Sequence, residues 1–410
     1  MRALVPWAGA LLVLAQASPA RAQDSPLLDS PLLDSPLLDS PLLDSLLRAC
    51  PTFRDSVLPE LARFELQVLY RPLDGPDGGR TYGYGVDPDR YFYPASTVKL
   101  PVAALALEKL EQLGVLGLDA DTRMEVDSVR APQSGSRLRI GTDEFATVGG
   151  HVRDIAVVSS NEAYNRLYEW LGPRHINDAL HRRGYRTRIV HRLGAPGFDT
   201  TENRYLPPVT FRDDGGGVLY HRGAAYAKTR HDVRRDAEVK GRGYYSDSEG
   251  RVIGEPFDMS HKNALALGDL ADVLQAVVAP ETVPPARRFD LRPSDHEMLV
   301  RALRTTPPES DNPGHRGEAP AYVKFLYYGG DGPLDAGGPV IYNKVGDAYG
   351  TLTDAAVFED AATGRRCVIA ATVLVNRNGV FNDGVYEYEA VGLPLLRELG
   401  RAVWRYHLGR

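Results

Sequence analysis

The order of apolar and polar residues divides the chain into strand-forming ends and a helix-forming middle. Apolar side chains alternate with polar ones at residues 64–70, which predicts a half-buried strand, and residues 81–86 can return beside it after a turn. Further strands are predicted at residues 339–344, 352–359 and 366–376. Helical spacing predicts helices at residues 58–62, 96–112, 151–171, 263–278 and 394–407. We therefore expect an α/β fold of the α+β type: an antiparallel β-sheet built from both chain ends and flanked by helices, with an all-helical part between them.

Residues 46–410 are predicted to form one globular domain. Its sheet part would comprise residues 46–95 and 336–410, and its helical part residues 96–335. Two stretches of the helical part fit neither pattern and are rich in Gly, Pro, Arg, Asp and Tyr. We expect these to be inserted hairpins and loops, near residues 204–260, with the clearest hairpin at 241–253, and near residues 279–335.

The first 45 residues have the pattern of an export segment followed by a tether. A basic start at Arg2, an apolar stretch and a small-x-small sequence at residues 20–22 predict a signal peptide at residues 1–22, and hence a secreted or periplasmic protein. An uncleaved membrane anchor is disfavoured because the apolar stretch is short. Residues 23–45 contain four copies of Ser-Pro-Leu-Leu-Asp. Proline at every fifth position breaks a helix interior, so we expect a flexible tether; leucines that bind a partner or lipid are the alternative.

The net charge limits the classes of binding partner that we expect, and the cysteine content limits the possible disulfides. The formal net charge of the 410 residues is −6, and loss of Arg2 and Arg21 with the signal peptide makes it more negative. This gives no general attraction to nucleic acid or to an anionic membrane, so we expect neither partner and no stable membrane insertion after cleavage. We also expect a monomer. The two cysteines, Cys50 and Cys367, could form one disulfide in an oxidising compartment or remain buried thiols.

Ser96 and Lys99 form the first motif that suggests catalysis. They lie three residues apart at the start of an apolar helix, so their side chains project from the same face. A serine is a poor nucleophile until a base takes its proton, and a desolvated lysine can lose its charge near neutral pH. Alone, the pair has a commoner explanation, a serine N-cap followed by a lysine that reaches the surface.

Two further motifs follow in order along the chain. Ser159-Ser160-Asn161 lies on the predicted helix after His151, with Asn165 on the same face, and Lys344-Val345-Gly346 ends a predicted strand. Taken alone, each is explained by polar positions on a helix or by a solvated strand end. Together, Ser-x-x-Lys, Ser-x-Asn and Lys-x-Gly resemble the motifs of the class A β-lactamase and penicillin-binding serine hydrolase family, over most of residues 50–410 apart from the inserts.

The resemblance implies a role for each matching residue. Ser96 would form an acyl-enzyme with Lys99 as its proton acceptor, Ser159 would pass a proton to the leaving nitrogen, and Lys344 would keep the local potential positive. The backbone N–H groups of Ser96 and Asp347 would form the oxyanion hole. The implied substrate-binding residues are Asn161, Asn165, Val345, Gly346 and Asp347.

The chain departs from the family pattern at two places. Val345 lacks the hydroxyl that in the family helps to hold a substrate carboxylate, Asp347 adds a negative charge, and residues 352–358 contain no arginine to compensate. The loop at residues 192–203 lacks the Glu-x-x-Leu-Asn sequence that supplies the deacylating base in class A enzymes. Glu202 is the first candidate for this base and Asp199 the second, whereas a loop cap or a surface charge is the ordinary alternative.

The remaining polar and aromatic groups of the sequence do not indicate a cofactor. His231-Asp232 and His296-Glu297 are adjacent pairs that do not share a helix face, so we expect no metal. Tyr322, Phe325, Tyr327 and Tyr328 would either line the cleft or pack within the insert.

The sequence thus predicts a serine hydrolase that acts on a small-molecule amide, a β-lactam or a cell-wall peptide without metal or cofactor. The alternatives are a D-alanyl peptidase or penicillin-binding enzyme with slow deacylation, and a non-catalytic binding protein with the same fold.

Overall fold

The computed structural model describes residues 37–229, 231 and 238–409. The predicted signal peptide and the first part of the predicted tether lie outside the described residues. All elements below belong to the part of the chain that follows residue 31.

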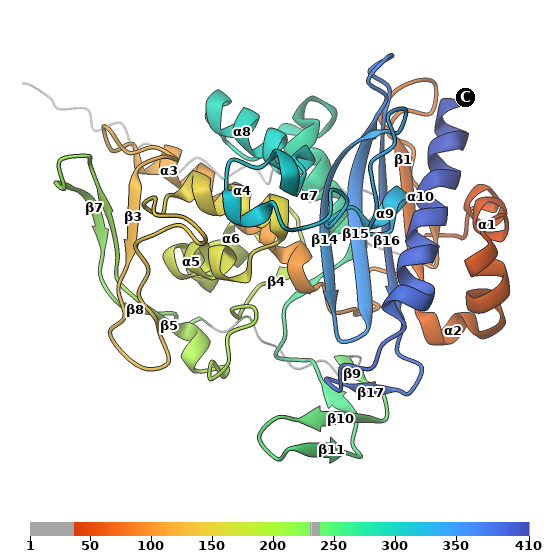
Figure 1. Ribbon diagram of the computed structural model, residues 1–410, viewed down its shortest axis with the longest axis horizontal. Coiled ribbons are helices and arrows are strands. Elements are labelled where there is room, and N and C mark those ends of the chain that lie inside the picture. Colours follow the sequence, from red (N-terminus) through yellow and green to blue (C-terminus); the bar gives the residue numbers. More distant parts are fainter. Residues whose placement is uncertain (1–36, 230, 232–237, 410) are drawn as a thin grey trace, which may run out of the picture. The chain divides into compact units, whose positions relative to one another are not determined.

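A five-stranded antiparallel sheet joins the two ends of this part of the chain, as predicted (Figure 1). The strands lie in the order β14-β15-β16-β1-β2, so the N-terminal pair adds to one edge of the C-terminal three. Gln67 in β1 pairs with Thr372 in β16. The strands are β1 (Gln67–Pro72), β2 (Tyr82–Tyr84), β14 (Val340–Ala348), β15 (Thr351–Glu359) and β16 (Arg366–Leu374).

One apolar core contains the C-terminal helix, α10 (Leu393–Leu408), together with side chains from the sheet. The helix predicted at residues 394–407 is confirmed, and its apolar residues Leu395, Leu399 and Trp404 are all buried. In Figure 1, α10 runs beside the sheet with α1 (Pro41–Arg48) on its outer side. The short helix α2 (Leu61–Phe64) and the turn labelled α9 (Phe325–Tyr328), in which Leu326 and Tyr327 have non-helical backbone angles, complete this layer.

The prediction of a tether up to residue 45 is wrong. The last copy of the repeat forms α1, in which Leu43 and Leu47 are fully buried. Before it, Ser40 N–H donates to Gly83 O at 2.8 Å on β2. Proline at the first position of a helix costs no hydrogen bond, so the same residue that breaks a helix interior starts this one. The folded domain therefore begins before residue 46.

A second core lies between the sheet and the helical part. It contains α3 (Lys99–Leu113) at its centre and α7 (Leu267–Val278) against β15 and β16. Helices α4 (Val148–Val158), α5 (Asn161–Leu171), α6 (Pro173–Arg182) and α8 (Pro293–Arg304) surround them. The predicted insert at 279–335 was wrong in one respect, because α8 is a regular helix within it. Pro293 at its first position was a helix-start signal.

The inserted segments form small sheets, and the predicted hairpin at 241–253 is confirmed. Strands β10 and β11 pair antiparallel there, and β17 joins β10 in parallel, so a late segment of the chain holds the hairpin. These strands are β10 (Gly243–Ser246), β11 (Arg251–Ile253) and β17 (Val380–Phe381). A second sheet contains β3 (Arg123–Val126), β6 (Val209–Arg212) and β7 (Val218–Arg222). Two-stranded pairs are formed by β4 (Thr187–Arg188) with β13 (Ala264–Leu265), β5 (Tyr205–Leu206) with β8 (Ala225–Tyr226), and β9 (Val239–Lys240) with β12 (Phe257–Asp258).

The cysteine alternatives are resolved by the structure. Cys50 and Cys367 are buried thiols in the core beside α10 rather than a disulfide. Within the described residues, no helix is long and apolar enough to cross a membrane.

Candidate active site

Ser96 lies in a tight turn that opens α3. Residues Ala95–Val98 form one 3₁₀ turn that continues into the helix. Ala95 has a φ of 46°, a left-handed conformation that is uncommon for a residue with a side chain. Ser96 is half-buried, whereas the other residues from 91 to 100 are buried. The turn therefore presents the serine hydroxyl at the edge of the core.

Lys99 is the centre of a hydrogen-bonded cluster that joins the first two motifs. Its Nζ lies 2.8 Å from Ser96 Oγ and 2.7 Å from Asn161 Oδ1, and it also donates to the backbone carbonyl of Ser159. The side chain is fully buried. Burial lowers the pKa of Lys99 well below its usual value, and the positive charge of Lys344 lowers it further.

The hydrogen bonds of Lys99 are those of a base oriented toward Ser96. A neutral amine has two N–H groups and one lone pair. Two carbonyl oxygens, those of Ser159 and the Asn161 side chain, can only accept, so they take the two N–H groups. The lone pair is left for the hydroxyl proton of Ser96. The arrangement therefore suits proton transfer from the serine to the lysine.

Ser159 ends one helix and is followed by the start of another, so the single predicted helix at 151–171 is wrong. Ser159 has a φ of 55° and terminates α4, while Ser160 caps α5 by accepting from Ala163 N–H at 3.2 Å. Serine hydroxyls compete with the helical backbone for hydrogen bonds, which favours such a break. The break places Ser159 Oγ 3.3 Å from Lys99 Nζ.

Lys344 brings the third motif to the same place. Its Nζ lies 2.8 Å from Ser159 Oγ. Burial lowers the pKa of Lys344 to about 7, although the negative charges of Asp347 and Asp354 act in the opposite direction. The predicted residues Ser96, Lys99, Ser159 and Lys344 therefore form one contiguous group.

The Lys-Val-Gly motif lies within β14 and not at the end of a strand, which corrects the prediction. Val345 is also removed from the predicted substrate-binding residues. Side chains alternate along a strand, and Val345 is buried in the core beside α10, not in the site. Gly346 packs against the nucleophile turn. A Cβ atom at Gly346 would lie 2.5 Å from Pro94 O and 3.0 Å from the backbone nitrogen of Ser96. Glycine is therefore required for this close approach.

A buried polar group behind β14 was missed by the sequence analysis. Lys324 Nζ donates to Asn343 Oδ1 at 2.7 Å, and Asn343 Nδ2 donates to Asp354 at 2.9 Å. Burial raises the pKa of Asp354 to about 6. Asn343 precedes Lys344, so this network fixes the strand that carries the lysine. Lys324 and Asp354 stand in apolar surroundings in the sequence, and that was the available signal.

The two predicted asparagines have different surroundings. Asn161 accepts from Lys99 and lies at the site. Asn165 holds the following loop instead, because its side chain donates to Leu193 O at 2.9 Å and accepts from Leu193 N–H at 2.8 Å. The same loop contacts Asn161, since a Cβ atom at Gly194 would lie 2.6 Å from Asn161 Nδ2. The assignment of Asn165 to substrate binding is therefore corrected to loop anchoring.

One carboxylate oxygen of Glu202 accepts from Arg130 at 2.9 Å, and within the described residues no hydrogen bond joins Glu202 to the group around Ser96. Asp199 caps the turn before it by accepting from the N–H groups of Thr201 and Glu202. The acidic side chain with a marked effect on Lys99 is Asp347, an exposed residue of β14 that raises the pKa of both lysines.

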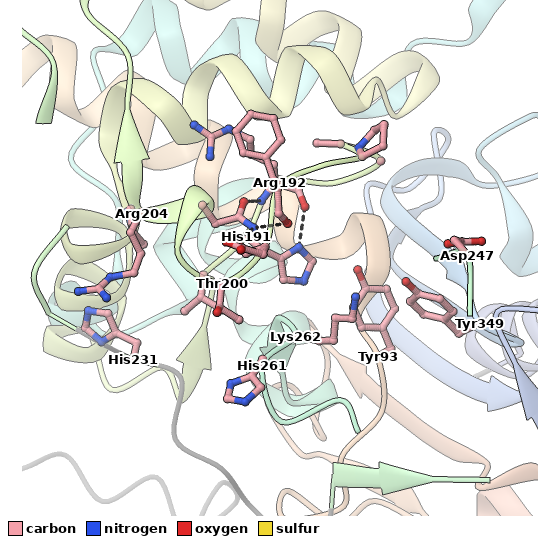
Figure 2. A pocket seen from close by; sticks show the side chains of 18 of the residues that line it. Tyr93, His191, Arg192, Thr200, Arg204, His231, Asp247, His261, Lys262 and Tyr349 are labelled. Atoms are coloured by element: carbon pink, nitrogen blue, oxygen red, sulfur yellow. Dashed lines mark hydrogen bonds between the residues drawn. The ribbon is translucent and has the colours of Figure 1, made fainter. Parts of the chain in front are cut away.

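A cavity of about 640 Å³ is lined by residues that flank the first and third motifs in the chain, and its wall was also missed (Figure 2). Tyr93, just before the nucleophile turn, stacks on His191 with ring centres 6.3 Å apart. Tyr349, just after β14, contacts Tyr93 edge-on at 5.0 Å. Lys262 enters the same wall from the insert. The signal available in the sequence was the position of Tyr93 and Tyr349, each within three residues of a motif.

The aromatic group at 322–328 packs mostly within the domain. Phe325 and Tyr328 are buried and Tyr327 packs against the core beside α10, as the packing alternative predicted. Tyr322 is 40% exposed. Burial raises the pKa of Tyr322, and the negative charges of Glu318 and Asp347 add to this effect. Across the described residues, no group of three His, Cys, Asp or Glu side chains is placed to hold a metal ion.

Comparisons with known proteins found one matching family model and several solved structures of similar fold. A family model described as the Beta-lactamase enzyme family matches residues 57–229. No curated protein matches the chain. Among solved structures, PBP-A is similar with a TM-score of 0.51 and 17% identity, over 92% of this chain and 99% of that chain. A β-lactamase from Burkholderia ambifaria gives 0.50 and 13%, over 89% and 98%. A PBP-A variant in an acyl-enzyme complex with penicillin G gives 0.50 and 16%, over 90% and 97%.

At these identities the solved structures establish the fold. The predicted class, a mixed helix and antiparallel-sheet protein with the β-lactamase fold, is confirmed. The match to the Beta-lactamase enzyme family covers the part of the chain that contains the Ser-x-x-Lys and Ser-x-Asn motifs.

Proposed function

We propose that this protein is an exported serine hydrolase that cleaves an amide bond through an acyl-enzyme on Ser96, with β-lactams as candidate substrates. The observation that carries the proposal is the chain of contacts from Ser96 through Lys99 and Ser159 to Lys344, with distances of 2.8, 3.3 and 2.8 Å. The residues come from three segments far apart in the sequence. A structural role alone gives no reason for two buried lysines to meet at one serine hydroxyl.

Acylation follows from the orientation of these groups. Ser96 Oγ attacks the carbonyl carbon of the amide, and its proton passes to the neutral Lys99 Nζ. A bond between Oγ and carbon forms, and the bond between carbon and nitrogen breaks. Ser159 Oγ, between the two lysines, gives its proton to the leaving nitrogen and regains one from Lys99. Lys344 stabilises the negative charge that develops near Ser159 during this exchange.

The developing oxyanion would be stabilised by backbone N–H groups. Ser96 lies at the start of a helical segment, where the first N–H groups have no partner within the helix. The edge of β14 at Gly346 and Asp347 lies against this turn. The N–H groups of Ser96 and Asp347 are therefore the candidate donors, and such a donor contributes about 2.7–4 kcal/mol in comparable sites.

A penicillin-binding enzyme with slow deacylation is the second candidate. The pairing of Glu202 with Arg130 favours it, because the carboxylate expected to activate the deacylating water is engaged elsewhere. The two candidates share acylation and differ in the lifetime of the acyl-enzyme. In support of β-lactam recognition, a structurally similar PBP-A variant is known as an acyl-enzyme with penicillin G.

Intact-mass measurement during reaction with a chromogenic cephalosporin tests the proposal. An adduct on Ser96 with rapid turnover supports the first candidate, and a stable adduct without turnover supports the second. Ser96→Ala must abolish both. Lys99→Met should slow acylation by about 10²- to 10⁴-fold, as for loss of a general base. Lys109→Met is the matched control, since Lys109 is another largely buried lysine of α3 that donates to Trp170 O. If no β-lactam or acyl ester probe forms an adduct, the remaining alternative is a non-catalytic binding protein.

Export is a separate part of the proposal and is supported by the pattern of residues 1–22. N-terminal sequencing of protein recovered outside the cytoplasm should begin near Gln23. An intact Met1 in that fraction would contradict cleavage.

A further inference from the structure

Three wall residues of the cavity lie next to residues of the candidate active site, in the chain or in space. Tyr93 lies three residues before Ser96, Tyr349 lies two residues after Asp347, and the backbone of Gly194 packs on Asn161. All three line the cavity of about 640 Å³. A substituent of a substrate held at Ser96 can therefore extend into this space.

Lys262 gives the cavity a positive charge. Its Nζ lies 5.6 Å from the ring centre of Tyr349 and 5.8 Å from that of Phe257, which places the ammonium group near two aromatic faces. Within the described residues, the structure gives no hydrogen bond or ion pair for this ammonium group. Figure 2 shows Lys262 beside Tyr93, with Tyr349 on the other side of Tyr93.

The position of Lys262 is fixed by its backbone. Arg188 Nε donates to Lys262 O at 2.8 Å, and Lys262 N–H donates to Met259 O at 2.9 Å. The next residue, Asn263, is fully buried and accepts from the N–H groups of Val190 and His191 at 2.8 and 3.2 Å. The backbone that carries the lysine is thus held in place before any ligand binds, so the ordering cost of binding is limited to the side chain.

The other charged groups of the wall already have partners. Asp199 accepts from two backbone N–H groups, and Asp247 accepts from Asn382 Nδ2 at 3.2 Å. Arg192 pairs with the buried Glu169 at 2.8 Å. Arg204 donates to two backbone carbonyls, those of residues 227 and 228.

The aromatic part of the wall is uncharged and offers flat surfaces. His191 stacks on Tyr93 with an angle of 2° between the rings. Burial lowers the pKa of His191 to about 3, and the charge of Lys262 lowers it further, so the imidazole is neutral at pH 7. The cavity thus combines one ammonium group with aromatic rings.

We propose that Lys262, with Tyr93 and Tyr349, forms a subsite for a carboxylate on the acyl side chain of the substrate. The subsite rests on the proposed function, since it assigns part of the substrate of that site. Asp347 disfavours an anion beside the Lys-Val-Gly motif, so an acidic substituent is better placed at Lys262.

The test compares benzylpenicillin with carbenicillin, which carries one additional carboxylate on its acyl side chain. Dissociation constants are measured by NMR titration of the Ser96→Ala protein, in which no acyl-enzyme can form. Carbenicillin should bind about fivefold more tightly than benzylpenicillin, as expected for one partly exposed ion pair. Lys262→Gln in the same background should remove this ratio, and Lys262→Arg should retain most of it. Arg48→Gln is the control for loss of one positive charge, because Arg48 lies exposed on α1.

Equal affinities in Ser96→Ala, or a carbenicillin preference that persists in Lys262→Gln, would overturn the subsite. Acylation of the wild-type protein by the two compounds is followed separately by intact mass. If neither these compounds nor any other β-lactam or acyl ester probe acylates Ser96, the proposed function fails, while the binding ratio still decides the subsite. Thermal unfolding of Lys262→Gln verifies that the variant is folded.

Discussion

Lys344 Nζ lies 2.8 Å from Ser159 Oγ, although 185 residues separate them in the chain. The same hydroxyl lies 3.3 Å from Lys99 Nζ. A serine between two buried amines can accept a proton from one side and pass one on without a change in its own charge. The pair therefore connects the strand motif to the nucleophile and defines the direction in which a proton can leave Ser96.

Replacing Ser159 by alanine should slow acylation without unfolding the protein. The hydroxyl is the link between Lys99 and Lys344, so its loss should lower the acylation rate constant by about 10²-fold or more. The measurement is the rate of adduct formation by intact mass at several β-lactam concentrations.

The neighbouring serine provides the matched control for this variant. Ser160 caps α5, so Ser160→Ala should cost about 1 kcal/mol in the free energy of unfolding and leave the acylation rate unchanged. Equal effects of the two substitutions on acylation would show that Ser159 acts through helix structure and not through its proton.

Glu202→Gln should leave the deacylation rate unchanged. One oxygen of the carboxylate pairs with Arg130 at 2.9 Å, and no hydrogen bond joins Glu202 to Ser96 or Lys99 within the described residues, so we expect it not to activate a water at Ser96. Loss of a true general base would slow deacylation by about 10²- to 10⁴-fold. The return of the free-enzyme mass after removal of excess β-lactam measures this rate. Glu162→Gln, on the exposed first turn of α5, is the control. Slow deacylation in Glu202→Gln but not in Glu162→Gln would identify Glu202 as the base.

Gly346→Ala should slow acylation by about 10²-fold. The new methyl group would meet Pro94 O at 2.5 Å and the backbone nitrogen of Ser96 at 3.0 Å, so the nucleophile turn must move. Displacement of a reacting group by about 1 Å costs this much in rate. Gly317→Ala is the control, because nothing lies within 4 Å of a Cβ atom there. Unchanged acylation in Gly346→Ala would mean that the turn is not held against β14.

The sequence was sufficient where periodicity or a motif specified an environment. The apolar face of α10 was predicted because burial of Leu395, Leu399 and Trp404 follows from helical spacing. The meeting of Ser96 and Lys99 was predicted because three-residue spacing fixes which side chains share a helix face. In both cases the determining interactions are local.

The structure could not be predicted from the sequence where contacts between distant parts of the chain determine it. The repeat around Leu43 has a composition typical of a tether, yet its last copy folds because Leu43 and Leu47 find an apolar surface beside α10. Val345 was assigned to the site because a motif does not say which of its side chains turn inward. The partner of Glu202, Arg130, lies 72 residues earlier, and no local pattern pairs them.

His151 should make the protein lose stability in acid. It is buried in α4, and neither ring nitrogen has a hydrogen-bond partner within the described residues. Burial lowers its pKa from 6.5 to about 4; Asp154 opposes this effect, whereas Arg166 and Arg139 add to it. Between pH 6.5 and 4 the unfolded chain binds a proton that the folded protein excludes, so the free energy of unfolding falls as the pH falls through this window. The loss attributable to this residue is on the order of 3 kcal/mol. Urea unfolding at several pH values should show a smaller loss of unfolding free energy in His151→Phe than in the wild type. His221→Gln, on the exposed strand β7, should behave like the wild type. An equal pH dependence of the unfolding free energy in all three proteins would contradict the assignment.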